Sequence, residues 1–279
     1  HAAGPFARTS APMVAACLRT KTHYLDITGE IPVFEACFAQ DGAAKAAGIT
    51  VLPGVGFDVV PSDCLAAHTA ARMPGAKSLV LAFKTVGGRI SHGTATTMVT
   101  GLGEPSARRI GGRIRAVRMG SRSRKIDFGR GPKPALGIPW GDVSTAFHST
   151  GIPDVEVFIS ATGGMIAGAW VGGFLGPLLK TEFVRNLAQK RIDAADAGPG
   201  AEQRGKAFSI LVAEVSDGER TLTSRLRCSE GYDLTARSGL EVARRAARGE
   251  LPTGFQTPSR ALGADFVLEL EGGNWEDLD

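Results

Sequence analysis

The sequence has few residues that could cross-link it or hold a metal ion. Its 279 residues include only four cysteines and five histidines, and no two cysteines form a C-x-x-C pair. This scarcity excludes a disulfide-rich scaffold and a zinc site built from thiolates. Three of the cysteines, Cys17, Cys37 and Cys64, fall in predicted helices, where small buried thiols are expected. No metal site is expected.

Several catalytic and nucleotide-binding signatures are also missing. The chain has no G-x-G-x-x-G turn, no G-x-x-x-x-G-K-[ST] loop, no H-E-x-x-H and no G-x-S-x-G. The first two cradle phosphates, and the others carry a zinc ligand pair or a serine nucleophile. The pyrophosphate-binding turn of a dinucleotide site is therefore not in this sequence.

Charge is nearly balanced over the whole chain but unevenly placed along it. The net charge is +4, and 43% of the residues are apolar, which is ordinary for a globular α/β protein. Residues 108–133, however, contain ten basic residues against one acid, Asp127, a local charge of +9. Arg113 and Arg115 alternate with apolar residues before a turn-like segment at 120–123, which predicts a β-hairpin with an arginine-rich face.

Two interpretations of this basic segment stay open. It is a solvated strand edge protected by its charge, or it is a docking surface for an acidic partner. Such a partner would be an anionic membrane, a phosphopantetheine carrier or a cofactor phosphate. A nucleic acid is not expected, because no aromatic residue alternates with the arginines to stack on bases.

One long segment carries no charge. Residues 157–179 are uncharged over 23 positions, which is long enough to cross a bilayer if helical. Glycine recurs at every fourth position from 164 to 176, a spacing typical of closely packed helices. A strand-like start, these glycines and Pro177 argue against a membrane span. We expect tight packing within the chain or between two subunits, with peripheral membrane contact and a true span as the alternatives.

The first 60 residues alternate between predicted strands and helices. Ser10, followed by Pro12, is expected to begin the first helix, and Gly48 to end the second. Residues 2–6 are expected to leave a strand, further strands are predicted at 23–27 and 49–52, and helices are predicted at 13–19 and 32–47. This order with short connections is the βαβαβ pattern of a parallel sheet. Because the chain begins without Met at the end of a strand, we expect an N-terminally truncated fragment.

The rest of the chain has a different pattern. Asp217-Gly218 between two apolar runs is a strong signal for a hairpin turn. The predicted elements are a helix at 64–73 capped by Ser62 or Asp63, a strand at 79–83, a helix at 91–101, the basic hairpin, a strand at 154–159, a hairpin of 206–215 and 220–226, a helix at 232–249 and a strand at 265–270. Together they indicate an α+β region with a mixed or antiparallel sheet.

Three loops follow the three N-terminal strands. They are Gly4-Pro5-Phe6, Thr28-Gly29-Glu30 and the segment 54–58, which ends in Gly56-Phe57-Asp58. Open α/β sheets bind ligands in loops at the carboxyl ends of their strands. Each loop offers a glycine where a flat ring could approach the backbone, and Glu30 and Asp58 are their only carboxylates. The loops therefore predict a single crevice.

These same segments resemble a known family. The motifs are AGPF at 3–6, HYLDITGE at 23–30, GVGFDVVPSD at 54–63, IPWGD at 138–142, STGIP at 149–153 and GFQTP at 254–258. In this order they resemble the saccharopine dehydrogenase-like oxidoreductases, and most closely the bacterial branch that includes trans-acting enoyl reductases. The likeness extends over essentially the whole chain.

The resemblance implies an α/β fold in two parts. Residues 1–75 would form the C-terminal half of a Rossmann domain, a partial parallel sheet. Residues 76–279 would form an α+β substrate domain with a mixed or antiparallel sheet. The helix 232–249 is expected to pack back on the first part. The missing N-terminal region would hold the glycine-rich turn that binds the cofactor.

The resemblance also assigns site residues. Ala3, Gly4, Pro5 and Phe6 would lie by the ribose and nicotinamide of NAD or NADP, and Thr28, Gly29 and Glu30 by the other side of the ring. The turn of Gly56, Phe57 and Asp58 would lie close to the hydride transfer. Asp58 is our candidate for the nearest polar catalytic group, with Tyr232 and His92 as remote proton donors; Trp140 and Asp142 would form a substrate wall.

Simpler structural roles exist for two of these sites. Asp58 could bond its own loop in an Asx turn. Trp140, Gly141 and Asp142 could form a packed turn in which Asp142 caps a helix that runs to Phe147.

The expected function is an NAD(P)-dependent oxidoreductase, cytoplasmic or peripheral to a membrane. It would reduce a small or carrier-bound acyl substrate by hydride transfer, with homodimerisation and anionic membrane contact as further expectations. The alternatives are a non-enzymatic lipid- or membrane-associated protein that keeps the fold, and a truncated, inactive fragment.

Overall fold

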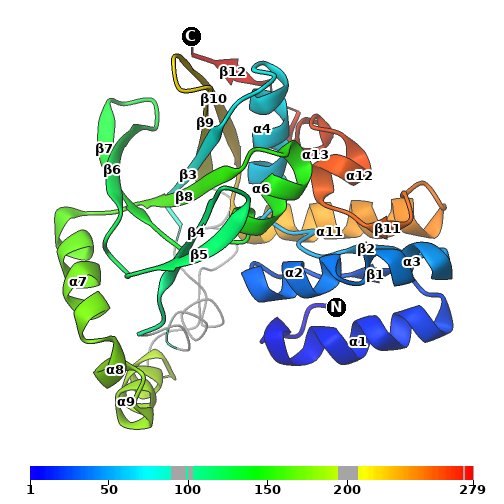
Figure 1. Cartoon of the computed structure of the whole chain (residues 1–279), viewed down its shortest axis with the longest axis horizontal. Helices are drawn as coiled ribbons and strands as arrows, with labels where there is room; N and C mark the ends of the chain where they lie inside the picture. The colour runs from blue at the N-terminus through cyan, green and yellow to red at the C-terminus, as the bar shows by residue number, and fades with distance from the viewer. Residues whose placement is uncertain (89–98, 100–102, 194–206, 273, 279) are drawn as a thin grey trace.

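A computed structural model of the chain describes residues 1–88, 99, 103–193, 207–272 and 274–278. Within these residues the strands form two sheets, a parallel one of three strands and a mixed one of nine (Figure 1). This arrangement confirms the predicted fold class, a partial parallel sheet followed by a region with a mixed sheet. The predicted helix at 91–101, which contains His92, lies outside the described residues apart from position 99.

The small sheet has the order β1 (Tyr24–Leu25), β2 (Thr50–Leu52) and β11 (Gly254–Phe255), all parallel. It packs with α1 (Phe6–Thr20), α2 (Ile31–Phe38) and α3 (Asp41–Ala47). Gly48 ends α3 with a left-handed backbone (φ 70°), as expected. The apolar core of this unit consists of Val14, Tyr24, Val33, Cys37, Ala44, Ile49, Val51 and Phe255.

Two N-terminal predictions were wrong. The chain does not leave a strand at 2–6, because residues 1–5 have no strand structure and α1 begins at Phe6, so Ser10 and Pro12 lie inside the helix. The helix can begin this early because a carboxylate from elsewhere in the chain, Glu30, accepts hydrogen bonds from its first two N–H groups. The third strand of the sheet is β11, which comes from near the C-terminus.

The large sheet has the order β12-β10-β9-β3-β8-β4-β5, and the hairpin β6–β7 joins it at β8. Its strands are β3 (Ser78–Val86), β4 (Ser106–Ile110), β5 (Arg113–Val117), β6 (Ser123–Asp127), β7 (Pro132–Gly137), β8 (Asp154–Ser160), β9 (Phe208–Ser216), β10 (Thr221–Ser229) and β12 (Glu276–Asp277). The pair β3–β8 is parallel, and the other pairs are antiparallel. The predicted hairpin around Asp217-Gly218 is confirmed as β9–β10.

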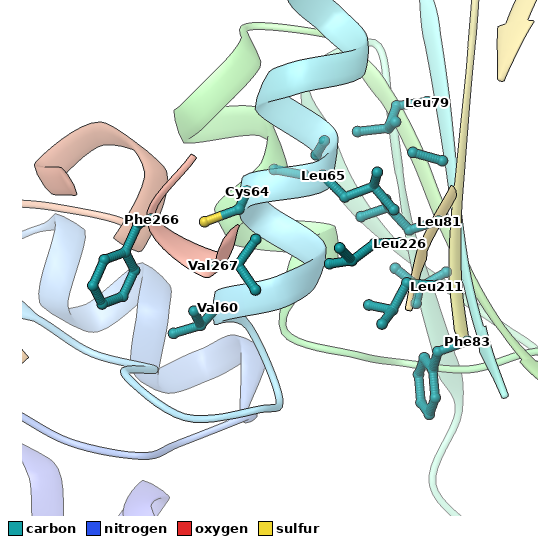
Figure 2. Packing of buried hydrophobic residues seen from close by; sticks show 14 of the residues in the cluster. Val60, Cys64, Leu65, Leu79, Leu81, Phe83, Leu211, Leu226, Phe266 and Val267 are labelled. Atoms are coloured by element: carbon teal, nitrogen blue, oxygen red, sulfur yellow. The ribbon is translucent and has the colours of Figure 1, made fainter. Parts of the chain in front are cut away.

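The helix α4 (Val60–Ala71) joins this sheet to the rest of the molecule. Figure 2 shows Leu65 facing Leu81 and Leu211 of the sheet, while Val60 and Cys64 point toward the C-terminal helix α13 (Phe266–Glu271). The helix begins four residues before the predicted start, because Pro61 suits a first turn. Ser62 and Asp63 are therefore buried inside the helix instead of capping it.

The segment 265–270, predicted as a strand, is α13. Its neighbouring residues Phe266 and Val267 are both buried against the core. Two adjacent side chains of a strand would point to opposite faces, whereas adjacent helix positions can both face a core. Gly272, with φ 67°, ends the helix. The remaining helices of this region are α6 (Asp142–Thr150), α11 (Gly231–Ala247) and α12 (Pro258–Leu262).

The basic segment forms two hairpins and not one. The first turns at Gly111-Gly112 and the second at 128–131, while the predicted turn at 120–123 connects strands that do not pair with each other. Four of its ten cations bind glutamates from elsewhere in the chain. Arg108 and Arg122 contact Glu156, Arg109 contacts Glu35, and Arg124 contacts Glu214.

The uncharged segment ends one strand and then forms two helices. After β8 come α7 (Gly163–Phe174) and α8 (Gly176–Leu179), and α9 (Glu182–Asp193) follows. In the part that the structure describes, no helix has both the length and the apolar character needed to cross a membrane.

Candidate functional site

A buried carboxylate, Asp26, ties together the loops that follow β1 and β2. Its oxygens accept hydrogen bonds from Thr28 N (3.0 Å), Gly54 N (2.9 Å) and the Tyr24 hydroxyl (2.6 Å). Burial raises the pKa of Asp26 above its ordinary value. We did not predict a role for this residue, although its place at the end of a strand, directly before the Thr28 loop, was a usable signal.

Glu30 brings the N-terminal loop to the same place. Its Oε1 accepts a bond from Phe6 N (2.8 Å) and its Oε2 from Ala7 N (2.9 Å). These N–H groups are the free donors at the start of α1, where a carboxylate is favoured by both hydrogen bonding and the helix dipole. Glu30 is itself fixed through its N–H, which donates to Thr28 Oγ1 (3.0 Å). The Gly4-Pro5-Phe6 loop therefore lies beside the Thr28-Gly29-Glu30 loop.

Gly29 lies against the third loop and against the loop before α6. A Cβ at position 29 would come within 2.8 Å of Asp58 Oδ2, so only glycine fits without moving Asp58. A Cβ at Gly141 would lie 3.2 Å from Gly29 O and 2.7 Å from the ring of Phe34. The backbones at 29, 58 and 141 therefore meet at one point.

Trp140 completes this cluster. Its indole Nε1 donates a 2.7 Å hydrogen bond to Asp58 O, and its ring lies 5.0 Å from the ring of Phe83. Phe57 contacts the same Phe83 ring edge-on, at 6.3 Å between centroids. Trp140, Phe57 and Asp58 are each partly exposed, so this end of the cluster reaches the surface.

Helix α11 supports the third loop from behind. Thr235 Oγ1 accepts a bond from Phe57 N (2.9 Å), and Ser238 Oγ donates to Val55 O (2.7 Å). A Cβ at Gly231 would lie 3.1 Å from the Phe57 ring. The next residue, the candidate Tyr232, therefore lies in the first turn of α11 beside this loop. Thr235 and Ser238 were missed, because nothing in the sequence pairs them with residues about 180 positions away.

The electrostatics single out Asp58. Burial raises the pKa of its carboxyl to about 6. Among the described residues, no group donates a hydrogen bond to this carboxyl, so the Asx turn is not formed in the structure. A carboxyl whose pKa is raised to about 6 and that reaches the surface between these loops can hold or release a proton near neutral pH.

Asp142 lies deeper than its predicted role requires. It is the first residue of α6 and not its cap, which is Gly141, and its side chain is fully buried. Burial raises its pKa well above the ordinary value, and the negative charges of Asp63 and Asp58 raise it further. In the described part of the chain its Oδ2 has no hydrogen-bond partner. The Asp142 side chain is buried next to the Trp140 loop. Contact between Asp142 and a substrate stays a prediction.

The structure thus brings together Phe6, Thr28, Gly29, Glu30, Phe57, Asp58 and Trp140, with exposed Ala3, Gly4 and Pro5 at the rim. Gly56 is held against Thr235. His92 lies outside the described residues. Within those residues, no three His, Cys, Asp or Glu side chains are grouped so that they could hold a metal ion.

Sequence comparison now adds to this geometry. A Mycobacterium tuberculosis protein that carries the name trans-acting enoyl reductase is 32% identical over 196 residues, covering 65% of this chain and 41% of that protein. A human saccharopine dehydrogenase-like oxidoreductase is 30% identical over 110 residues, covering 37% of this chain and 25% of that protein. The chain is therefore similar in sequence to proteins that carry these two names. No family model matches it.

Two solved structures share the fold of this chain. Saccharopine dehydrogenase from Saccharomyces cerevisiae superposes with a TM-score of 0.56 at 12% identity, covering 95% of this chain and 82% of that one. The homospermidine synthase of Legionella pneumophila, solved with NAD, superposes with a TM-score of 0.59 at 8% identity, covering 96% of this chain and 72% of that one. At such identities the likeness concerns the fold alone. The chain spans less than half the length of the mycobacterial relative it matches.

Proposed function

We propose that this chain forms the ring-facing side of an NAD or NADP site in an oxidoreductase. In this proposal the Asp58 carboxyl holds the proton that accompanies hydride transfer. The observation that carries it is the meeting of Gly29, Asp58 and Trp140, with an Asp58 pKa of about 6. The names of the relatives support the reaction class.

The described residues suit only one end of such a cofactor. At the ring end, Gly4 is exposed and a Cβ there would meet only Phe6, so a flat group could approach the backbone. At the pyrophosphate end no glycine-rich turn is present, and Glu30 already occupies the N-terminal donors of α1. We therefore assign no phosphate-binding residue in this chain.

The protein's own contribution to the chemistry is orientation and one proton. A bound nicotinamide would supply or accept the hydride. The Gly4 and Gly29 backbones would set the position of the ring, while Phe57 and Trp140 would limit water around it. Asp58, anchored through its carbonyl by Trp140, would donate a proton in the reductive direction and accept one in the oxidative direction.

The substrate class remains part of the proposal. The relatives are named trans-acting enoyl reductases, and we propose that this chain acts on an enoyl substrate carried on a partner protein. Six cations of the basic segment form no ion pair with an acidic side chain in the described chain and are available to attract an acidic carrier: Arg113, Arg115, Arg118, Lys125, Arg130 and Lys133. Docking of this kind accelerates association at low salt and weakens as salt rises.

The first experiment measures cofactor binding by calorimetry. We expect NADH or NADPH to bind, and reduced nicotinamide mononucleotide to bind within about tenfold of the dinucleotide, because this chain lacks a pyrophosphate cradle. Absence of binding by all three would refute the site and favour the non-enzymatic alternative.

The second experiment measures oxidation of the bound reduced cofactor by enoyl thioesters, free and carrier-linked, at low and high salt. Asp58→Asn should lower kcat by at least about 100-fold with little change in cofactor affinity. Asp217→Asn, in the exposed β9–β10 turn, is the matched control and should keep full activity. Equal rates for free and carrier-linked substrate at every salt concentration would remove the carrier from the proposal.

A further inference from the structure

The three helices after β8 form an arm that leaves the body of the molecule. Figure 1 shows α7, α8 and α9 running away from the edge of the large sheet. We call residues 163–193 the helical arm. No residue of α7 is buried, although the helix holds no charged side chain. Eight of the fourteen exposed large apolar residues in the described chain lie on the arm: Met165, Trp170, Val171, Phe174, Leu175, Leu178, Phe183 and Leu187.

Three of these side chains share one face of α7. At about 100° per residue, Trp170, Val171 and Phe174 lie within an arc of about 100°, and the Trp170 and Phe174 rings contact each other with 4.7 Å between centroids. Trp170, Val171 and Phe174 are 49%, 47% and 57% exposed. An exposed apolar face on a helix without charged side chains fits the boundary between lipid headgroups and acyl chains, where such a face is covered.

Close backbone contacts hold the arm at a fixed angle. A Cβ at Gly120 would lie 2.3 Å from Trp170 N, and one at Gly173 would lie 2.3 Å from Met119 O. A Cβ at Gly103 would lie 2.5 Å from Gly176 O. Of the four glycines predicted to pack closely, at 164, 168, 172 and 176, only Gly176 would place a Cβ closer than 3.4 Å to another atom, and a Cβ at Gly168 would meet nothing within 4 Å. Gly173, which makes the tightest contact, was not part of that prediction. The arm is presented in one orientation and is not a loose tail.

Cations lie at the base of the arm beside its aromatic rings. The Arg118 guanidinium lies 3.9 Å from the ring centre of Phe174 and 5.4 Å from that of Trp170. Arg118 and Lys180 line the same cavity of about 300 Å³, together with Met119 and Pro177. Glu104 also lines it and pairs with Lys180 at 2.8 Å.

The apolar part of the helical arm also lacks acidic side chains. No acidic residue lies between Glu156 and Glu182, so the apolar part of the arm is free of negative charge. Aromatic rings next to arginine and lysine are typical of side chains at a membrane–water interface, where the rings enter the apolar region and the cations stay with the headgroups.

We propose that the helical arm inserts into the surface of an anionic lipid bilayer. The apolar side chains of α7 and α8 lie at the boundary of headgroups and acyl chains. Arg118 and Lys180 lie at the level of the lipid phosphates and favour negatively charged lipid.

The test is sedimentation of the full chain with vesicles, and it needs no cofactor, so its failure is separate from that of the oxidoreductase proposal. Vesicles of phosphatidylcholine with phosphatidylglycerol should bind the chain, and pure phosphatidylcholine should bind it much less. The double variant Trp170→Ser/Phe174→Ser should bind at least about tenfold more weakly. Leu240→Ser removes a similarly exposed apolar side chain on α11 and should bind like the wild type.

Lys180→Gln should weaken binding to the anionic vesicles about fivefold and leave the weak binding to neutral vesicles unchanged. Near-ultraviolet circular dichroism shows whether each variant keeps its fold. No binding of the wild type to anionic vesicles, or an equal loss in Leu240→Ser, overturns the proposal. A lipid-free dimer that the double variant abolishes would instead identify a second copy as the occupant and would also overturn it.

Discussion

Asp58 illustrates how the surroundings of a single residue define its chemistry. A carboxyl normally titrates near pH 4, far from neutrality. At this position burial raises the pKa to about 6, and in the described chain no hydrogen bond or cation lowers it again. Asp26, only two loops away, is also buried, but three donors surround it and tie it to the scaffold. The two aspartates therefore differ in their surroundings, since three donors hold the Asp26 carboxylate and, in the described chain, none donates to the Asp58 carboxyl.

The titration of Asp58 gives a prediction that needs no substrate. The carboxyl carbon of Asp58, followed by NMR, should titrate with a midpoint near pH 6, and its signal should be absent from Asp58→Asn. In turnover the protonated form donates, so the reductive rate should fall as pH rises through about 6, and the oxidative rate should rise. An Asp58 midpoint at its ordinary value, or a pH profile that Asp58→Asn leaves unchanged, would contradict this assignment.

Glu30 shows a second kind of residue effect, in which a long-range contact decides local structure. Twenty-four residues separate it from the N–H group of Phe6 that it binds. The sequence pattern around Ser10 and Pro12 favours a later helix start, and the Glu30 carboxylate overrides it by satisfying the first free donors of α1.

At the scale of elements, two glycines of the helical arm allow the effect of close packing to be distinguished from the effect of helix propensity. Gly168 and Gly173 lie in the same helix, α7, but a Cβ at 168 meets nothing within 4 Å and one at 173 meets a carbonyl oxygen at 2.3 Å. Gly168→Ala should therefore stabilise α7 by about 1 kcal/mol through helix propensity. Gly173→Ala should push the arm from the 118–120 segment at a cost of about 1–3 kcal/mol.

Hydrogen exchange of the α7 amides measures both effects. We expect slower exchange in Gly168→Ala and faster exchange in Gly173→Ala, with the amides of β3 and β9 unchanged in both. Similar behaviour of the two variants would show that the arm is not held by the contact between Gly173 and Met119.

Elements were predictable where the pattern was local. The hairpin β9–β10 followed from alternation around Asp217-Gly218, and the parallel β1–β2 pair from short strands joined by helices. Elements that depend on tertiary contacts were not predictable. The strand β11 is two residues long and pairs with β2 some 200 residues away. The helix α13 alternates like a strand, but burial of both Phe266 and Val267 selects the helix.

The candidate site was likewise predictable where it depends on local sequence patterns and not where it depends on tertiary contacts. The meeting of three loops could be expected, because the carboxyl ends of neighbouring parallel strands share one edge of a sheet. The contacts that hold these loops could not, since Asp26 acts through backbone donors and Thr235 and Ser238 lie on a helix far along the chain. Side-chain burial, which separates Asp58 from Asp142, is likewise set by packing and leaves no mark on the sequence.

At the scale of the whole molecule, one ionic cluster links the two sheets. Glu35 of α2, in the small-sheet unit, binds Arg109 of β4 at 2.7 Å and accepts a 2.6 Å bond from Ser144 of α6. Arg109 is almost fully buried, donates to Val143 O and Gly112 O, and stacks on Phe147. A cation with three fixed acceptors holds the two units in one relative position, which the candidate site requires.

This link predicts acid sensitivity of the folded chain. The His148 ring, whose Nε2 lies 3.6 Å from Glu35 Oε1, the Ser144 hydrogen bond and the Arg109 charge lower the pKa of Glu35 to about 2, although its burial acts in the opposite direction. A carboxyl whose folded pKa is lowered contributes stability above its unfolded pKa and loses it as pH falls. The loss should therefore extend from about pH 4.5 to about pH 2, and because Glu35 is 39% exposed it should amount to only about 1–2 kcal/mol.

Urea denaturation of the wild type and Glu35→Gln across this pH range measures the effect. The variant should be less stable than the wild type at neutral pH, because it leaves Arg109 buried without a counter-charge. That difference should shrink as pH falls, since acid removes the same charge from the wild type. Glu219→Gln, in the exposed β9–β10 turn, controls for the loss of any carboxylate and should follow the wild type throughout. A difference between wild type and Glu35→Gln that stays constant down to the lowest pH would show that the cluster does not couple the two sheets through charge.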